Sequence, residues 1–241
     1  SWITRISNSE LLSKPTKLYY KIFKLTRLGP ESSQKIVNAI QSDDTNQETI
    51  QQMRYCDGAG QYSYRGIPVR RIHLRMHSPQ ICPLCIKEFG YAKSFWDLRV
   101  ATTCHIHCVS LTDTCPGCNS LIRWHRPSLS RCTCSAHLDR LTTQDSPKLA
   151  QFNELLYCLH HNEYQPNFSN PIYKIIQEGT VADVINVIEK FGNNFYTGRS
   201  PHSKSRNIKP YSAKHPKFFK SLVTVFVGLL DDWPKTFLKF I

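Results

Sequence analysis

The stretch TTCHIHCVSLTDTCPGC, residues 102–118, decides the fold because six of its seventeen residues are of types that can bind soft metals. These residues are Cys104, His105, His107, Cys108, Cys115 and Cys118. Such a density of thiols and imidazoles suits either a metal site or a disulfide framework. The chain holds ten Cys in 241 residues and opens SWITRISNSE, without a secretion signal. We therefore interpret the cysteines as metal ligands, and we expect the natural chain to begin before Ser1.

The paired spacings predict two separate tetrahedral sites. The first joins Cys82-Pro-Leu-Cys85 to Cys104-His-Ile-His107, and the second joins Cys115-Pro-Gly-Cys118 to Cys132-Thr-Cys134. Four protein ligands close the coordination of Zn²⁺ and leave no position for water, which is typical of a structural site. We expect two structural Zn²⁺ ions. In CHIHC, Cys104 and His107 form the natural second pair, with His105 and Cys108 as competitors.

Zinc chemistry of an enzymatic kind is disfavoured. The sequence contains no H-E-x-x-H motif and no deaminase signature, and no glycine-rich phosphate loop appears. We therefore expect no catalytic residues. Cys56 and Cys158 stand apart from the paired cysteines, and we interpret them as small buried apolar residues.

Composition and charge indicate a globular chain with an acidic partner. Apolar residues make up 40% of the chain, and the formal net charge is +13. A basic balance favours nucleic acid or an acidic protein surface, although plain solubility is the alternative. The longest apolar run, LVTVFVGLL at residues 222–230, is too short to cross a membrane. We expect a cytoplasmic protein.

The chain divides into three predicted regions, which are an N-terminal helical region over 1–77, a tandem zinc-binding core over 78–140 and a C-terminal helical region over 141–241. The N-terminal region is predicted to form three short helices with basic residues between them, which would suit a helix-turn-helix or a plain helical domain equally. Residues 69–77 alternate between apolar and basic side chains. This pattern predicts a half-buried strand or extended segment, whose basic face would meet phosphates or solvent.

The C-terminal region is predicted to be helical over 147–162, 171–179 and 180–192, and over two helices that break near Trp233-Pro234. Residues 193–220 hold seven Lys or Arg and no acid, so 193–217 is predicted to be a basic linker. The fold class is thus mainly α with small zinc-stabilised β/loop modules. Candidate contacts to nucleic acid or a partner are Arg71, Arg75, Arg199, Lys204, Arg206 and Lys209.

The run HSPQICPLCIKEFGYAKSFWDLRVATTCHIHCVSLTDTCPGCNSL, residues 77–121, resembles the zinc-binding domain of the TniQ family. The residues that carry the resemblance are Cys82, Cys85, Glu88, Tyr91, Trp96, Cys104, His107, Leu111, Cys115 and Cys118. The opening SWITRIS is similar to the family's N-terminal helix. The segment DDWPKTFLKFI is similar to an aromatic-Pro segment of longer members.

The resemblance implies a target-site selector of a bacterial cut-and-paste transposon, which connects a chosen DNA site to an AAA+ regulator and is not the nuclease. TnsD-like members bind an attachment site directly, and others ride as dimers on an RNA-guided Cascade complex. The resemblance gives the first ion to Cys82, Cys85, Cys104 and His107, and the second to Cys115, Cys118, Cys132 and Cys134. Two departures bear on this assignment. Cys108 stands where many members have a small or polar residue, and the last pair is C-x-C.

From this resemblance we expect a homodimeric adaptor between a Cascade complex and the AAA+ regulator, acting in transposition at the bacterial nucleoid. One alternative is a TnsD-like protein that reads an attachment site in DNA itself. The other alternative is a zinc-ribbon scaffold for protein interaction alone.

Overall fold

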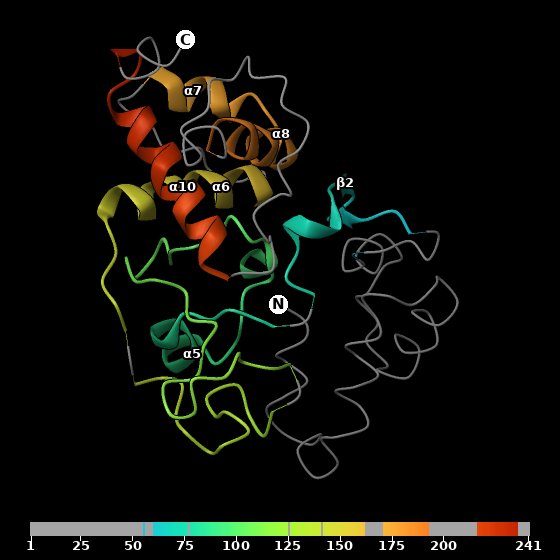
Figure 1. Ribbon diagram of the computed structural model, residues 1–241, viewed down its shortest axis with the longest axis vertical. Coiled ribbons are helices and arrows are strands. Elements are labelled where there is room, and N and C mark those ends of the chain that lie inside the picture. Colours follow the sequence, from blue (N-terminus) through green and yellow to red (C-terminus); the bar gives the residue numbers. More distant parts are fainter. Residues whose placement is uncertain are drawn as a thin grey trace, which may run out of the picture.

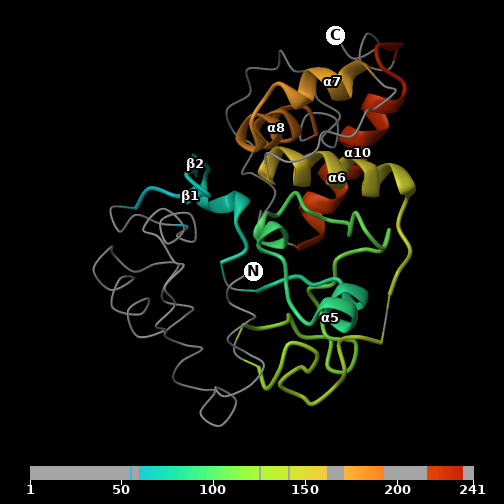
Figure 2. The same cartoon turned by 180° about the vertical axis from the view of Figure 1, so that it is seen from behind.

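The computed structural model describes residues 55, 60–76, 78–124, 126–140, 142–161, 171–192 and 216–235 (Figure 1). These residues form a mostly helical structure with one small two-stranded sheet. The helices predicted within 1–55, and nearly all of the predicted basic linker 193–217, lie outside them. α5 and its surrounding loops lie on one side of helix α6, and helices α7 and α8 lie on the other, as the reverse view also shows (Figure 2).

The loop-rich side has few regular elements, and the hairpin that precedes it is short. Strands β1 (Ser63–Tyr64) and β2 (Ile67–Pro68) pair antiparallel, with Tyr64 opposite Ile67. Arg65 and Gly66 form the two-residue turn with φ values of 50° and 81°, as the favoured hairpin turns require. Further along lie the 3₁₀ helices η2 (Arg71–His73) and η3 (Ser94–Asp97), with helix α5 (Pro83–Phe89) between them.

The helical side has helices close to the predicted bounds 147–162, 171–179 and 180–192 and a helix before Trp233-Pro234, whereas the helix predicted after Pro234 lies almost wholly outside the described residues. The helical side contains α6 (Pro147–His161), α7 (Pro171–Gln177), α8 (Val181–Val187), a π-helical turn (Ile188–Gly192) and α10 (Pro216–Asp231). Thr180 caps α8 through a capping box with Asp183, which supports the predicted cap. α10 buries an apolar stripe at helical spacing, made of Phe219, Leu222, Val223, Phe226, Val227 and Leu230.

One apolar cluster runs through both sides. It contains the fully buried Cys82 and Cys104 of the loop-rich side, together with Phe152 of α6 and Leu222 of α10. The Phe152 and Phe226 rings meet edge to face with centroids 5.7 Å apart. Packing between α6 and α10 thus continues directly into the part of the chain that carries the clustered cysteines.

The prediction of a half-buried strand or extended segment with a basic face over 69–77 is wrong at residues 71–75. Residues 71–73 form a 3₁₀ turn, and Leu74 makes only an isolated bridge to Leu98. His73 and Arg75 are both buried. Each has an acidic partner distant in sequence, because the Arg75 guanidinium lies 2.9 Å from Asp113 and His73 Nε2 lies 3.2 Å from Glu189.

His73 is buried between a basic and an acidic neighbour. The backbone N–H of Arg70 donates to Nδ1 of His73 at 3.3 Å, while Nε2 lies 3.3 Å from the Arg70 guanidinium and 3.2 Å from a carboxylate oxygen of Glu189. Burial first, and then the charges of Arg70 and Arg99, lower the pKa of His73 to about 4. His73 is therefore buried against Glu189 of the π-helical turn rather than exposed to solvent.

In the ranges that the structure describes, none of the helices combines the length and apolar content needed to cross a membrane.

Candidate metal centres

The first centre consists of Cys82, Cys85, Cys104 and His107, whose ligand atoms all lie within 4.8 Å of one another. Cys82 is the N-cap of α5, and its Sγ accepts a hydrogen bond from the backbone N–H of Cys85 at 3.4 Å. Pro83 fills the first helical position, where a missing N–H costs nothing. The first turn of α5 therefore directs both sulfurs to one point.

The distances in the first centre fit a tetrahedral zinc site. Sulfurs that are each about 2.3 Å from zinc are separated by about 3.8 Å along a tetrahedral edge. The Cys85 and Cys104 sulfurs lie 3.5 Å apart. His107 Nδ1 lies 3.2 Å from Cys85 Sγ and 3.6 Å from the sulfurs of Cys82 and Cys104. The donor set is therefore one that could hold a soft divalent cation.

Mutual hydrogen bonding among the three thiols points the same way. The hydrogen bond with Cys104 raises the pKa of Cys82 to about 11, and bonds with Cys104 and Cys82 raise the pKa of Cys85. The same bonds lower the pKa of Cys104. Three sulfurs this close would repel one another as thiolates, and a central Zn²⁺ would stabilise all three in that form.

The second centre consists of Cys115, Cys118, Cys132 and Cys134, again within 4.8 Å. Two sulfur pairs lie close to the tetrahedral edge length, at 3.6 Å for Cys115 and Cys134 and 3.9 Å for Cys118 and Cys132. The two centres differ in burial. Cys115 and Cys132 are buried, but Cys118 and Cys134 are exposed.

Three of the four cysteine-containing turns share one backbone frame. In each, the N–H of the first cysteine donates to a carbonyl just beyond the second ligand. These bonds join Cys104 to Val109 at 2.8 Å, Cys115 to Ser120 at 2.8 Å and Cys132 to Ala136 at 3.0 Å. We call these three turns the knuckles. The shorter C-x-C spacing removes one residue from the third knuckle but leaves the bond in place.

Each knuckle places the residue after its second ligand in the left-handed region. The φ angles are 52° at Cys108, 54° at Asn119 and 69° at Ser135. This conformation is uncommon for residues other than glycine and reverses the chain direction tightly. The side chain at this position therefore leaves the cluster that its predecessor enters.

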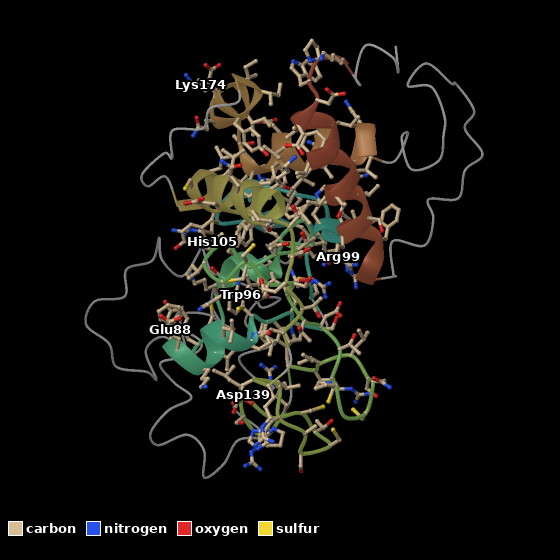
Figure 3. The ribbon with its side chains drawn as sticks, turned by 90° about the vertical axis from the view of Figure 1, so that its left-hand side faces the viewer. Glu88, Trp96, Arg99, His105, Asp139 and Lys174 are labelled. Carbon is tan, nitrogen blue, oxygen red and sulfur yellow. The ribbon has the colours of Figure 1, made fainter. Side chains whose placement is uncertain are left out.

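This geometry separates Cys108 and His105 from the first centre. Cys108 Sγ donates to the backbone carbonyl of Asp145 at 3.4 Å. The His105 ring stacks on Tyr157 of α6 with centroids 4.4 Å apart and meets Phe95 edge to face. Figure 3 shows His105 beside α6, and Glu88 on α5. Of the alternatives left open by CHIHC, the structure brings Cys104 and His107 to the cluster.

A polar network that the sequence did not reveal fastens the first centre to the helices. The Asp145 carboxylate accepts hydrogen bonds from Thr103 Oγ1 at 2.7 Å, Ser110 Oγ at 2.9 Å and Lys220 Nζ at 3.0 Å. Burial would raise the pKa of Asp145, but bonds from Thr103, Lys220 and Ser110 outweigh it and lower that pKa. Asp145 is therefore a charged junction between a knuckle and α10.

Asn153 makes a second junction from the buried face of α6. Its fully buried Oδ1 accepts the backbone N–H of Thr102 at 3.0 Å and of Thr103 at 3.5 Å. Its Nδ2 donates to Leu149 O at 2.8 Å. Thr102 and Thr103 lie 51 and 50 residues from Asn153, so no local pattern could have identified this contact.

Asp97 is a buried carboxyl at the end of η3. It accepts a hydrogen bond from Tyr55 Oη at 2.6 Å. Burial raises the pKa of Asp97 to about 7, while the Tyr55 bond and the charge of Arg75 act in the opposite direction. The adjacent Trp96 is 1% exposed and is part of the core. Its ring therefore packs inside the protein and is not available to stack on a nucleic-acid base.

The candidate contact residues have different outcomes. Arg71 is exposed on η2, whereas Arg75 is engaged with Asp113 inside the molecule. The Arg75 side chain is therefore not available to a contact surface, which corrects the expectation from the alternating pattern. The remaining candidates, Arg199, Lys204, Arg206 and Lys209, lie outside the described residues.

Comparison with known proteins confirms the family resemblance in the N-terminal part. The family model for TniQ matches residues 2–111, somewhat less than half of the chain. The match includes all four residues of the first centre and ends before Cys115, so the second centre lies beyond it. No curated protein matches the chain.

Proposed function

We propose that this chain is a non-enzymatic target-selection protein of a bacterial transposon, with two structural zinc ions. The observation that carries the proposal is the coincidence of the TniQ match with a complete donor set, Cys82, Cys85, Cys104 and His107, inside the matched segment. The donor atoms close a tetrahedron among themselves. Such a centre supports a surface and leaves no coordination position for a substrate.

The role proposed for the metal is to replace apolar core. Residues 78–140 contain only one α-helix among the described elements, and their loops are joined by isolated bridges. Segments this irregular bury too little apolar surface to fold alone, and metal binding supplies the missing free energy. When bound, Zn²⁺ contributes bonds and charge neutralisation to this region.

The proposed action is that of an adaptor. As a homodimer, the chain would bind an RNA-guided Cascade complex on its target DNA. It would connect this complex to the AAA+ regulator of transposition in the bacterial cytoplasm. A net charge of +13 supports contact with such an assembly, since nucleic acid and its complexes are acidic.

Direct DNA reading is the second candidate, supported by exposed arginines near the second centre. These are Arg123, Arg131 and Arg140, in addition to Arg71 on η2. Contacts between such residues and phosphates lose affinity steeply with salt, because each contact releases counterions. A scaffold for protein interaction alone would show no such dependence.

The test is a pull-down of the tagged chain with purified Cascade and with the AAA+ regulator, in the presence and absence of DNA. The adaptor proposal expects capture of both partners without DNA, and loss of capture in Cys104→Ala but not in Cys158→Ala, a buried cysteine outside both centres. Failure to capture either partner would contradict it. Gel shifts at about 50 and 200 mM salt then test direct reading, which requires binding at the lower concentration.

A further inference from the structure

His107 presents two different nitrogens to two different partners. Nδ1 faces the sulfurs of Cys82, Cys85 and Cys104 at 3.2–3.6 Å. Nε2 points away from them and lies 2.8 Å from a carboxylate oxygen of Glu88. Only Nδ1 is therefore positioned to bind an ion in the first centre.

The Glu88 contact defines the proton on the other nitrogen. A neutral imidazole carries one N–H, and a carboxylate can only accept a hydrogen bond. A proton on Nε2 therefore satisfies Glu88 and leaves the lone pair of Nδ1 directed at the sulfurs. The opposite tautomer would block the ligand nitrogen and place two acceptors 2.8 Å apart.

Helix α5 supplies a ligand and the orienting carboxylate as one rigid unit. Cys85 and Glu88 are three positions apart, so both lie on the same face of the helix. Gly90 ends the helix in the left-handed conformation, with φ of 70° and its N–H on the Ile86 carbonyl. The Phe89 ring, with its centroid 6.5 Å from that of His107, stands next to the same imidazole.

We infer that Glu88 is a positioning residue for the first metal centre, where its carboxylate fixes the His107 tautomer and directs Nδ1 to the ion. The inference rests on the proposed zinc binding and goes beyond the eight ligands. Carboxylates behind a ligating histidine raise metal affinity by about 10- to 100-fold. The Glu88 side chain is 52% exposed, so water competes for the bond and the lower end of that range is expected.

The experiment measures the affinity of each centre in the full-length zinc-loaded chain by competition with a chromophoric chelator. Glu88→Ala should weaken the first ion about tenfold and leave the second unchanged. Glu88→Gln keeps an oxygen acceptor and should recover part of the loss. Lys87→Ala, an exposed neighbour on the same helix, should match the wild type.

A second readout reports on the imidazole itself. A ¹H–¹⁵N correlation spectrum of the ring should show His107 protonated at Nε2 in the zinc-loaded wild type, with mixed or exchanging ring states in Glu88→Ala. A change in overall stability alone would not move this signal.

Two outcomes would overturn the inference, namely equal affinities in Glu88→Ala and Lys87→Ala, or a wild-type ring protonated at Nδ1. A wild-type chain that bound no zinc would instead remove the centres, and with them the proposed function. A chain with two ions and an unaffected Glu88→Ala variant would leave the proposed function standing.

Discussion

At the scale of the residue, the second centre depends on the absence of a side chain at Gly117. A Cβ added at Gly117 would lie 2.6 Å from the Cβ of Ala136, below any real contact distance. The obstacle is a short side chain on the facing knuckle, which cannot rotate away. Gly117 is therefore required by close approach between the two knuckles of this centre.

We predict that Gly117→Ala destabilises the second centre by about 1–3 kcal/mol through overpacking. Zinc competition should show weaker binding of one ion only. Gly228→Ala is the matched control, because nothing lies within 4 Å of its added Cβ, and on α10 it should raise stability by up to about 1 kcal/mol. Equal effects of the two substitutions would contradict the steric account.

Asp97 makes stability depend on pH in a stated direction. Burial raises the pKa of Asp97 from 3.8 to about 7, so between these values the folded chain binds a proton that the unfolded chain has released. This contribution to stability is present at low pH and is lost as pH rises through about 7. Asp97→Asn should remove this fall of the unfolding free energy with pH. The unfolding free energy of the variant relative to the wild type should therefore be about 1–3 kcal/mol higher at pH 8 than at pH 5.

Denaturant unfolding at several pH values between 5 and 8 measures this difference between variant and wild type. Asp232→Asn, on an exposed carboxylate, controls for the change in net charge. A slope that survives in Asp97→Asn would assign the dependence to another group.

At this scale the sequence predicted the members of both clusters but not the surroundings of a basic residue. Paired spacing identifies Cys82 and Cys85 because a tight turn and a soft donor set leave little choice of geometry. Alternation at 69–77 could not reveal that Arg75 is buried, since its partner Asp113 lies 38 residues away. A local pattern of apolar and basic residues does not show whether a distant acid such as Asp113 will pair with the basic side chain.

At the scale of the element, α6 is fixed to the first centre through one buried amide. Asn153→Ala would leave the N–H groups of Thr102 and Thr103 without their acceptor in a buried site. We predict a loss of about 1–3 kcal/mol in unfolding free energy. Faster hydrogen exchange at Thr102 should accompany it.

The matched control for this prediction is Asn186→Ala on the exposed face of α8. It removes the same amide and should change stability little. Unchanged exchange at Thr102 in Asn153→Ala would show that the α6 contact is replaced by another group or by water.

The sequence predicted the described C-terminal helices well, because apolar periodicity and the Thr180 cap are local signals. It did not predict which helix faces the knuckles. That arrangement depends on pairs such as Lys220 with Asp145, 75 residues apart, and such pairs leave no periodic trace. The predicted N-terminal helices lie outside the described residues, and they stay a prediction.

At the scale of the whole molecule, the two centres differ in protection. All three sulfurs of the first are fully buried, whereas Cys118 and Cys134 of the second are exposed. We predict that a thiol-alkylating reagent or a chelator removes the second zinc ion first. Zinc release monitored with a chromophoric chelator should show two phases, each of one ion per chain.

Peptide mapping by mass spectrometry identifies the phase. Early alkylation should fall on Cys118 and Cys134, while Cys82 and Cys85 stay protected until the second phase. A single phase that releases both ions together would contradict the difference in protection.

The shared apolar cluster has a consequence for biosynthesis. Cys82, Cys85 and Cys104 are synthesised long before Leu222, yet all four belong to one core. The zinc-binding segments can thus fold first and offer an apolar surface on which α10 packs. Completion of the fold then depends on the supply of zinc. In a zinc-starved cell the apolar stripe of α10 would stay uncovered, and proteolytic quality control would remove the chain before it reached a partner.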